Sequence, residues 1–161
     1  MAIKVGDKLP QATFRVMTAD GPAAKTADDL FKGRKIVLFA VPGAFTPTCT
    51  NMHMPSFVKN TDAIKAKGVN DIIVTSTNDV FVLNQWLKAT GAEGKVTALS
   101  DGNGQFAKAM GMDFDGSARG LGTRTKRYSM LVEDGVVKKL NLEEQAGQCT
   151  VSGGDTLLGQ L

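Results

Sequence analysis

Residues 35–55 have the sequence KIVLFAVPGAFTPTCTNMHMP. The apolar run at 36–41 predicts a buried strand, which a Pro-Gly pair ends. We expect a helix to begin near Pro47 or Thr48, so that Cys49 lies in its first turn. Backbone N–H groups lack helical partners at this end, and the helix dipole there favours an anion. The segment therefore predicts a reactive cysteine that is held as a thiolate.

Two residues of the loop before the expected helix can assist such a thiolate. Thr46 stands three positions before Cys49, and its hydroxyl can hydrogen-bond to the sulfur or to a substrate. Pro42 restricts the loop backbone and can shield one side of the sulfur from water. A thiolate that attacks a peroxide also needs a cation to stabilise the departing oxygen. This cation has to come from elsewhere in the chain.

The segment at 41–50, VPGAFTPTCT, resembles the peroxidatic-cysteine motif of the peroxiredoxins, Pro-x-x-x-Thr/Ser-x-x-Cys. Within it, the stretch PGAFTPTC is similar to the type II, or Prx5-type, subgroup of that family. Segments 71–86, 126–135 and 151–161 resemble the same family in the same order. The resemblance therefore covers nearly the whole chain and is more specific than the cysteine motif alone.

The resemblance implies roles for five residues. Cys49 would be the peroxidatic nucleophile, Thr46 the hydroxyl that positions the peroxide, and Pro42 the shielding proline. Arg127, in KRYSM, matches the arginine that lies beside the thiolate, and it would supply the missing cation. Some members have a resolving cysteine near the C-terminus. Cys149 lies in a similar segment but in a different register, so a resolving and a non-resolving role both stay open.

The implied activity is that of a thiol-dependent peroxidase, an antioxidant enzyme of cell redox homeostasis. It would reduce hydrogen peroxide and alkyl hydroperoxides through a sulfenic acid on Cys49. Glutathione with glutaredoxin, or thioredoxin, would restore the thiol, and no metal, haem, flavin or nicotinamide cofactor is expected. Members of the family often form homodimers, and we expect such an interface near Phe45, Phe81 and Trp86.

Other functions fit parts of the sequence. The same thiol could serve a non-enzymatic redox sensor or a thioredoxin-like binding module, but a disulfide oxidoreductase would need a Cys-x-x-Cys pair, which the chain lacks. His53 shares a helix face with Cys49, yet a structural zinc needs about four ligands, so we expect His53 to be structural or modulatory. The segment at 102–107 matches a dinucleotide-binding pattern, but Arg124 stands where the ribose-binding acid is required.

Length and composition exclude several further classes. The 161 residues suit a single domain spanning residues 1–161, and 42% of them are hydrophobic. The net charge of +3 comes from 19 basic and 16 acidic residues, which is too balanced to indicate nucleic acid or an anionic membrane as a partner. Two cysteines fit working thiols in a reducing compartment, and the N-terminal segment has no targeting pattern. We therefore expect a cytoplasmic protein.

The order of apolar segments and turns predicts an α/β sandwich. The resemblance implies its form, a thioredoxin-like three-layer sandwich in which helices flank a mixed central sheet. We expect a kink at Pro55 within the cysteine helix, an edge strand at 12–17 and a mobile glycine-rich loop at 113–124. The remaining strands are expected at 71–77, 96–99, 126–133 and 136–140, and the remaining helices at 79–91, 105–110 and 152–161.

Overall fold

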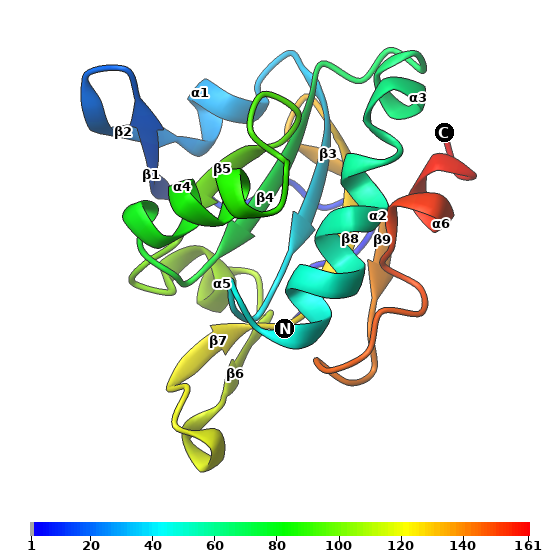
Figure 1. Ribbon diagram of the computed structural model, residues 1–161. Coiled ribbons are helices and arrows are strands. Elements are labelled where there is room, and N and C mark those ends of the chain that lie inside the picture. Colours follow the sequence, from blue (N-terminus) through cyan, green and yellow to red (C-terminus); the bar gives the residue numbers. More distant parts are fainter. Residues whose placement is uncertain (1) are drawn as a thin grey trace.

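A mixed sheet of seven strands forms the centre of the molecule in the computed structural model, which describes residues 2–161 (Figure 1). The strands lie in the order β2-β1-β5-β4-β3-β8-β9. Their bounds are β1 Thr13–Thr18, β2 Gly21–Thr26, β3 Lys35–Ala40, β4 Asp71–Ser76, β5 Thr97–Ser100, β8 Tyr128–Glu133 and β9 Val136–Leu142. Two short strands, β6 Asp113–Asp115 and β7 Thr123–Thr125, form a separate hairpin.

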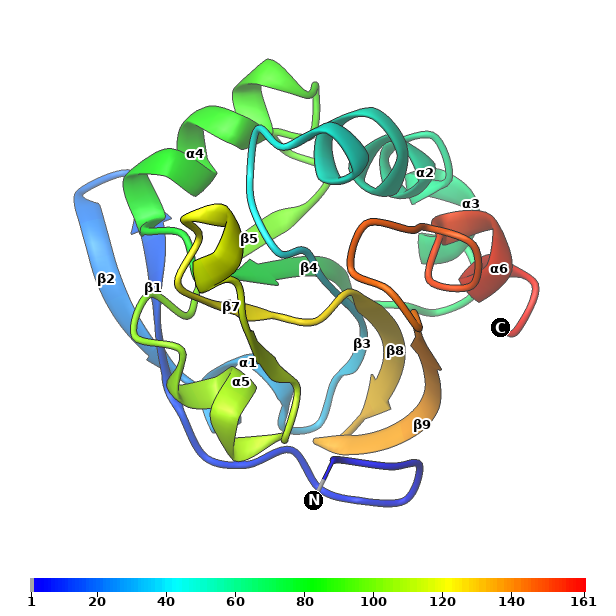
Figure 2. The same ribbon diagram turned by 90° about the horizontal axis from the view of Figure 1, so that it is seen from below.

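Helices cover both faces of the sheet and give the expected three layers (Figure 2). On one face lie α2 Met54–Val58, α3 Thr61–Lys65, α4 Val80–Ala89 and α6 Gly154–Leu158, and on the other lie α1 Ala27–Phe31 and α5 Gln105–Ala109. A π-helical turn, η1 Cys49–His53, precedes α2, and a 3-10 turn, η2 Ser117–Arg119, lies between β6 and β7. None of the helices within residues 2–161 is long and apolar enough to cross a bilayer.

The strand directions agree with the predicted mixed sheet. β3, β4 and β5 run parallel, whereas β8 runs antiparallel to β3 and pairs with β9 as a hairpin. Ala40, the last residue of β3, pairs with Tyr128, the first residue of β8. This register brings the residue before β8 to the carboxyl end of β3, where the cysteine loop begins.

Alternation along the strands divides the apolar side chains between two cores. Ile36, Leu38 and Ala40 of β3 face the core under α1 and α5, together with Tyr128 and Met130 of β8. Val37, Phe39 and Val41 face the opposite core, which also contains side chains of η1, α2 and α4. Because the side-chain period of a strand is two residues, Arg127 faces the same layer as Cys49, opposite to Tyr128.

Two expectations about the periphery are wrong. The strand predicted at 12–17 is not an edge, because β2 pairs along its outer side with register Thr13 to Thr26. The segment at 113–124 is not an irregular loop, since β6 and β7 pair in register and project from the body of the molecule as a hairpin (Figure 1). β6 and β7 have only three residues each, and β2 has the sequence GPAAKT, so none of them shows the apolar alternation that predicts a strand.

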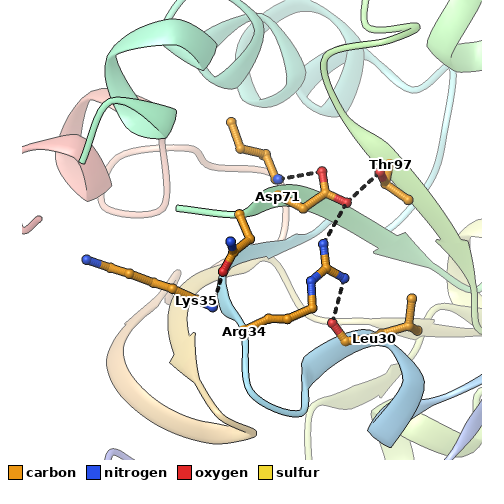
Figure 3. A network of polar contacts seen from close by, with 7 residues as sticks. Leu30, Arg34, Lys35, Asp71 and Thr97 are labelled. Carbon is orange, nitrogen blue, oxygen red and sulfur yellow. Dashed lines mark hydrogen bonds and ion pairs between the residues drawn. The ribbon is translucent and has the colours of Figure 1, made fainter. Parts of the chain in front are cut away.

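A polar network fixes the amino ends of the three parallel strands (Figure 3). The Asp71 carboxylate accepts hydrogen bonds from the Thr97 hydroxyl and the Ile72 N–H, at 2.8 and 2.9 Å. The Arg34 guanidinium lies 3.9 Å from the same carboxylate and donates to the Leu30 carbonyl. This end of the sheet is therefore fixed by polar contacts, while the cysteine lies at the carboxyl ends, where sites of parallel sheets form.

Candidate active site

Cys49 lies in the first turn of a helix that begins at Pro47, as the sequence predicted. From Cys49 to His53 this helix has the π form, and the Met54 N–H donates to the Cys49 carbonyl. Pro55 follows and has no N–H to donate one turn back, so the wider turn replaces the α-helical pattern in front of it. The expected irregularity at Pro55 therefore takes the form of a π turn directly at the cysteine.

The thiol of Cys49 is fully buried and lies against Arg127. Arg127 Nη2 donates to the Cys49 sulfur at 3.0 Å, although 78 positions separate the two residues in sequence. The guanidinium is fixed by two more bonds, from Nε to the Ala146 carbonyl and from Nη1 to His53 Nδ1, each 2.9 Å long. A planar group held at three points has one orientation, so its position at the sulfur is well defined.

His53 is the second support of Arg127 and is itself fully buried. Its Nε2 lies 2.9 Å from the Ser152 carbonyl oxygen, and the centroid of its ring lies 5.0 Å from that of the Phe39 ring. Burial, and then the positive charge of Arg127, lower the pKa of His53 to about 3. The neutral ring therefore accepts at Nδ1 from Arg127 and donates at Nε2 to Ser152. His53, which was predicted to be structural or modulatory, therefore lies in the site and bonds to Arg127.

The positive charge of Arg127 is buried and has to be compensated by a neighbouring group. Only 2% of Arg127 is exposed, and within residues 2–161 no carboxylate lies close enough to form an ion pair with it. A buried cation is costly unless an anion compensates it. The one acceptor of Arg127 that can carry a negative charge at neutral pH is the Cys49 sulfur. A negative charge on Cys49 would compensate this cation, and the thiolate is the nucleophilic form of cysteine.

The loop before the helix is held by contacts from two directions. The Thr46 hydroxyl donates to the Gly43 carbonyl at 2.5 Å, which leaves its oxygen lone pairs free to accept from a substrate. Arg124 Nη1 donates to the carbonyl of the buried Pro42 at 3.0 Å. A Cβ on Gly43 would lie 3.0 Å from this guanidinium and 3.1 Å from the Thr46 methyl group. A side chain at this position would therefore require the Arg124 guanidinium or the Thr46 methyl group to move by a few tenths of an ångström.

A cleft of about 600 Å³ opens at this loop. Pro42, Thr46 and Arg127 line it, so three of the four residues assigned to the reaction border the same space. Phe114 and Leu121 of the β6–β7 hairpin form part of the opposite wall. The cleft is therefore lined by a cation, a hydroxyl and an apolar wall, which suits a small polar group that bears an organic substituent.

Cys149 lies on a loop that borders the site, but it is not bonded to Cys49, and both cysteines are free thiols. Its sulfur lies 3.9 Å from the Ser152 hydroxyl. Burial raises the pKa of the Cys149 thiol. At neutral pH this thiol is therefore protonated and is a weaker nucleophile than a thiolate.

Some features of the site could not be found by sequence reasoning. The i, i+4 spacing of Cys49 and His53 indicated a shared helix face, but not that His53 contacts Arg127. No sequence signal indicated Glu143, whose carboxylate fixes the loop at 150–152. The prediction that Trp86 lies at a dimer interface is wrong, because this residue is fully buried and its indole N–H donates to the Thr50 hydroxyl at 3.0 Å.

A buried cysteine bonded to an arginine at the carboxyl end of β3, in a thioredoxin-like sheet, is typical of thiol-based redox enzymes. The redoxin family profile matches residues 4–158. The chloroplastic peroxiredoxin-2E-2 of Oryza sativa subsp. japonica is 47% identical over 164 residues, which cover 99% of this chain and 72% of that protein. Peroxiredoxin-2C of the same plant is 41% identical over 160 residues, which cover 99% of this chain and 98% of that protein.

Solved structures agree with this assignment. Reduced Prx3 of Vibrio vulnificus, in complex with hydrogen peroxide, superposes with a TM-score of 0.93 at 42% identity and covers 98% of both chains. The chain therefore belongs to the redoxin family, and within it to the type II (Prx5-type) peroxiredoxins, which are thiol-dependent peroxidases. The predicted thioredoxin-like fold and antioxidant enzyme class are thereby confirmed.

Proposed function

We propose that Cys49 is the peroxidatic nucleophile and that Thr46, Pro42 and Arg127 assist it. The thiolate attacks the terminal oxygen of a hydroperoxide, an S–O bond forms, and the O–O bond breaks. Sulfur loses two electrons and becomes a sulfenic acid, while the departing oxygen takes a proton and leaves as water or an alcohol. The Arg127 guanidinium stabilises the charge on the departing oxygen, and the Thr46 hydroxyl orients the peroxide.

The observation that carries this proposal is the contact of 3.0 Å between the buried Arg127 guanidinium and the Cys49 sulfur. Arg127 also borders the cleft, so it can contact the sulfur and an incoming peroxide together. Pro42 is buried beside the same loop and keeps water from one side of the thiolate. The hydrogen peroxide complex of the Vibrio vulnificus relative supports hydrogen peroxide as a substrate.

We further propose that an external thiol, glutathione with glutaredoxin or thioredoxin, reduces the sulfenic acid. The first thiol displaces water to form a mixed disulfide, and a second thiol releases Cys49 with formation of a new disulfide. Burial raises the pKa of the Cys149 thiol, which makes it a weaker nucleophile toward the sulfenic acid. This supports reduction by an external thiol. Cys149 as the resolving thiol is the alternative, and it would form an internal disulfide instead.

Intact mass measured seconds after one equivalent of hydrogen peroxide is added to the reduced protein tests both steps. Gain of one oxygen on Cys49 supports an external reductant, and loss of two hydrogens within a monomer supports Cys149 as the resolving thiol. Cys49→Ser should abolish turnover, whereas Cys149→Ser should retain the oxidation of Cys49. Unchanged peroxidase activity in Cys49→Ser would refute the assignment of the nucleophile.

Three wider properties also belong to the proposal. We propose that residues 1–161 act as one domain and that two copies form a homodimer. Phe45 and Phe81 are 54% and 62% exposed, and the Ala44 N–H donates to the Asn78 side chain, which joins their two segments. A cytoplasmic location stays a prediction, and named relatives include chloroplastic and mitochondrial proteins.

A further inference from the structure

The carboxylate of Glu143 is buried at the end of β9 and binds one short segment of the chain. Its Oε2 accepts from the N–H groups of Thr150, Val151 and Ser152, at 3.0, 2.8 and 2.7 Å, and from the Ser152 hydroxyl at 2.6 Å. Its Oε1 accepts from the Thr150 hydroxyl at 2.9 Å. Burial alone would raise the pKa of this carboxyl, but these hydrogen bonds lower it to about 2. Glu143 is therefore ionised and fully bonded at neutral pH.

These bonds complete a closed ring that includes the cation of the active site. The Glu143 N–H donates to the Arg127 carbonyl at 3.1 Å, and the Glu143 carboxylate holds Ser152. The Ser152 carbonyl lies 2.9 Å from His53 Nε2, and His53 Nδ1 lies 2.9 Å from Arg127 Nη1. The ring thus runs from the Arg127 backbone through Glu143, Ser152 and His53 back to the Arg127 guanidinium. The guanidinium in turn contacts the Cys49 sulfur.

The segment between Glu143 and Ser152 supports the site at two further points. The Ala146 carbonyl accepts from Arg127 Nε at 2.9 Å, and the Gly147 carbonyl accepts from the Thr48 hydroxyl at 2.9 Å. Most of this segment is exposed and belongs to no helix or strand, so its own structure does not fix these carbonyls. The Glu143 carboxylate fixes the far end of the segment and so sets where it can lie.

We propose that Glu143 is a positioning residue for peroxide reduction, which acts through Ser152 and His53 on the orientation of the Arg127 guanidinium at Cys49. The inference rests on Cys49 being the nucleophile. Glu143 itself does not contact the reacting atoms. Its negative charge would disfavour a nearby thiolate, so a purely electrostatic role predicts faster reaction when the charge is removed. A positioning role predicts slower reaction, and the sign separates the two.

The test compares Glu143→Ala with Glu144→Ala, which removes the same charge from the exposed neighbouring position. The second-order rate constant for hydrogen peroxide should fall between about tenfold and about a hundredfold in Glu143→Ala, the effect of a misplaced catalytic group. It should stay within about twofold in Glu144→Ala, as for most surface substitutions. Glu143→Gln, which keeps an acceptor oxygen in place, should recover part of the loss.

A double-mutant cycle shows whether the effect passes through Arg127. In an Arg127→Ala background, Glu143→Ala should change the rate constant by less than about twofold, because the group that it positions is absent. The pH at which ultraviolet absorbance reports half of the thiolate should also rise in Glu143→Ala alone. A merely structural role would lower the melting temperature and leave the rate constant and this midpoint unchanged, which would overturn the proposal.

Two controls keep the result interpretable. If circular dichroism shows that Glu143→Ala does not fold, Ser152→Ala serves instead, since it removes one donor to the carboxylate and keeps the Ser152 carbonyl. It should slow the reaction by about threefold to tenfold, the effect of one hydrogen bond, and a wild-type rate would contradict the inference. Cys49→Ser separates the two proposals: its continued turnover would refute the nucleophile, whereas an inactive Cys49→Ser with a wild-type Glu143→Ala would refute only the role of Glu143.

Discussion

Arg127 Nη2 lies 3.0 Å from the Cys49 sulfur, and both residues are buried. The guanidinium has no carboxylate partner within residues 2–161, and the sulfur is the acceptor that lies against it. In the proposed reaction this contact has two consequences: the cation stabilises the nucleophilic thiolate, and it also lies where the peroxide oxygen would depart.

Replacement of Arg127 should therefore impair the chemical step. We expect Arg127→Ala to lower the second-order rate constant for hydrogen peroxide by about a hundredfold to a thousandfold, as for loss of one preorganised donor. Arg127→Lys keeps the charge but cannot bond to Cys49, His53 and Ala146 together, so its rate constant should lie between those of wild type and Arg127→Ala. Stopped-flow measurement of peroxide reduction checks both, and an unchanged rate in Arg127→Ala would refute the assignment.

The hydroxyl of Thr46 gives a second prediction. Thr46→Val keeps the shape of the side chain and removes the oxygen that donates to the Gly43 carbonyl and faces the cleft. The peroxide step should slow by about tenfold to a hundredfold, the effect of one oriented hydrogen bond. Thr46→Ser keeps the hydroxyl and should restore most of the rate. Wild-type kinetics in Thr46→Val, with unchanged circular dichroism, would rule out this role.

His53 should make folding stability depend on pH. Burial and the Arg127 charge lower its pKa from 6.5 to about 3, so the unfolded chain binds this proton more tightly than the folded protein. The resulting stability is fully present above pH 6.5 and is lost as the pH falls from 6.5 toward 3. The free energy of unfolding should then decline with a slope approaching about 1.4 kcal/mol per pH unit.

Urea unfolding at several pH values measures that slope. His53 is the only histidine, so His53→Gln, which retains an acceptor and a donor, should flatten the slope near pH 6.5. Glu143 adds a separate loss at lower pH, because hydrogen bonds hold its pKa at about 2 and stability falls as the pH drops below 4.5. An equally steep decline near pH 6.5 in His53→Gln would show that another group is responsible.

The proposed homodimer predicts a concentration-dependent mass that depends on two exposed rings. Phe45 has a φ of 64°, a left-handed conformation that is unusual for an aromatic residue, and it is 54% exposed. Phe45→Ala and Phe81→Ala should each weaken the dimer by about tenfold or more, as expected of buried aromatic anchors. Val5→Ala, at another exposed apolar residue, is the control. Sedimentation of the wild type as a monomer at all concentrations would contradict the proposal.

The local structure around Cys49 was determined by the sequence itself. The continuous apolar run at 36–41 specifies a strand that is buried on both faces, and the following Pro-Gly pair and helix start bring Cys49 to its carboxyl end. The capping residue Asp79 begins α4 where the sequence predicted a helix at 79–91. These features depend on neighbours a few residues apart, and a sequence states such neighbours directly.

The environment of the thiol was decided by tertiary structure. Arg127 reaches Cys49 because Tyr128 pairs with Ala40 across two antiparallel strands, and this register depends on the packing of both cores. Glu143 acts on the site through a loop with no regular structure, and Trp86 is buried by contacts with another helix. Such contacts join positions that are far apart in the chain. Their energy comes from the burial and desolvation of the groups that meet, and these are set only when the whole fold has formed.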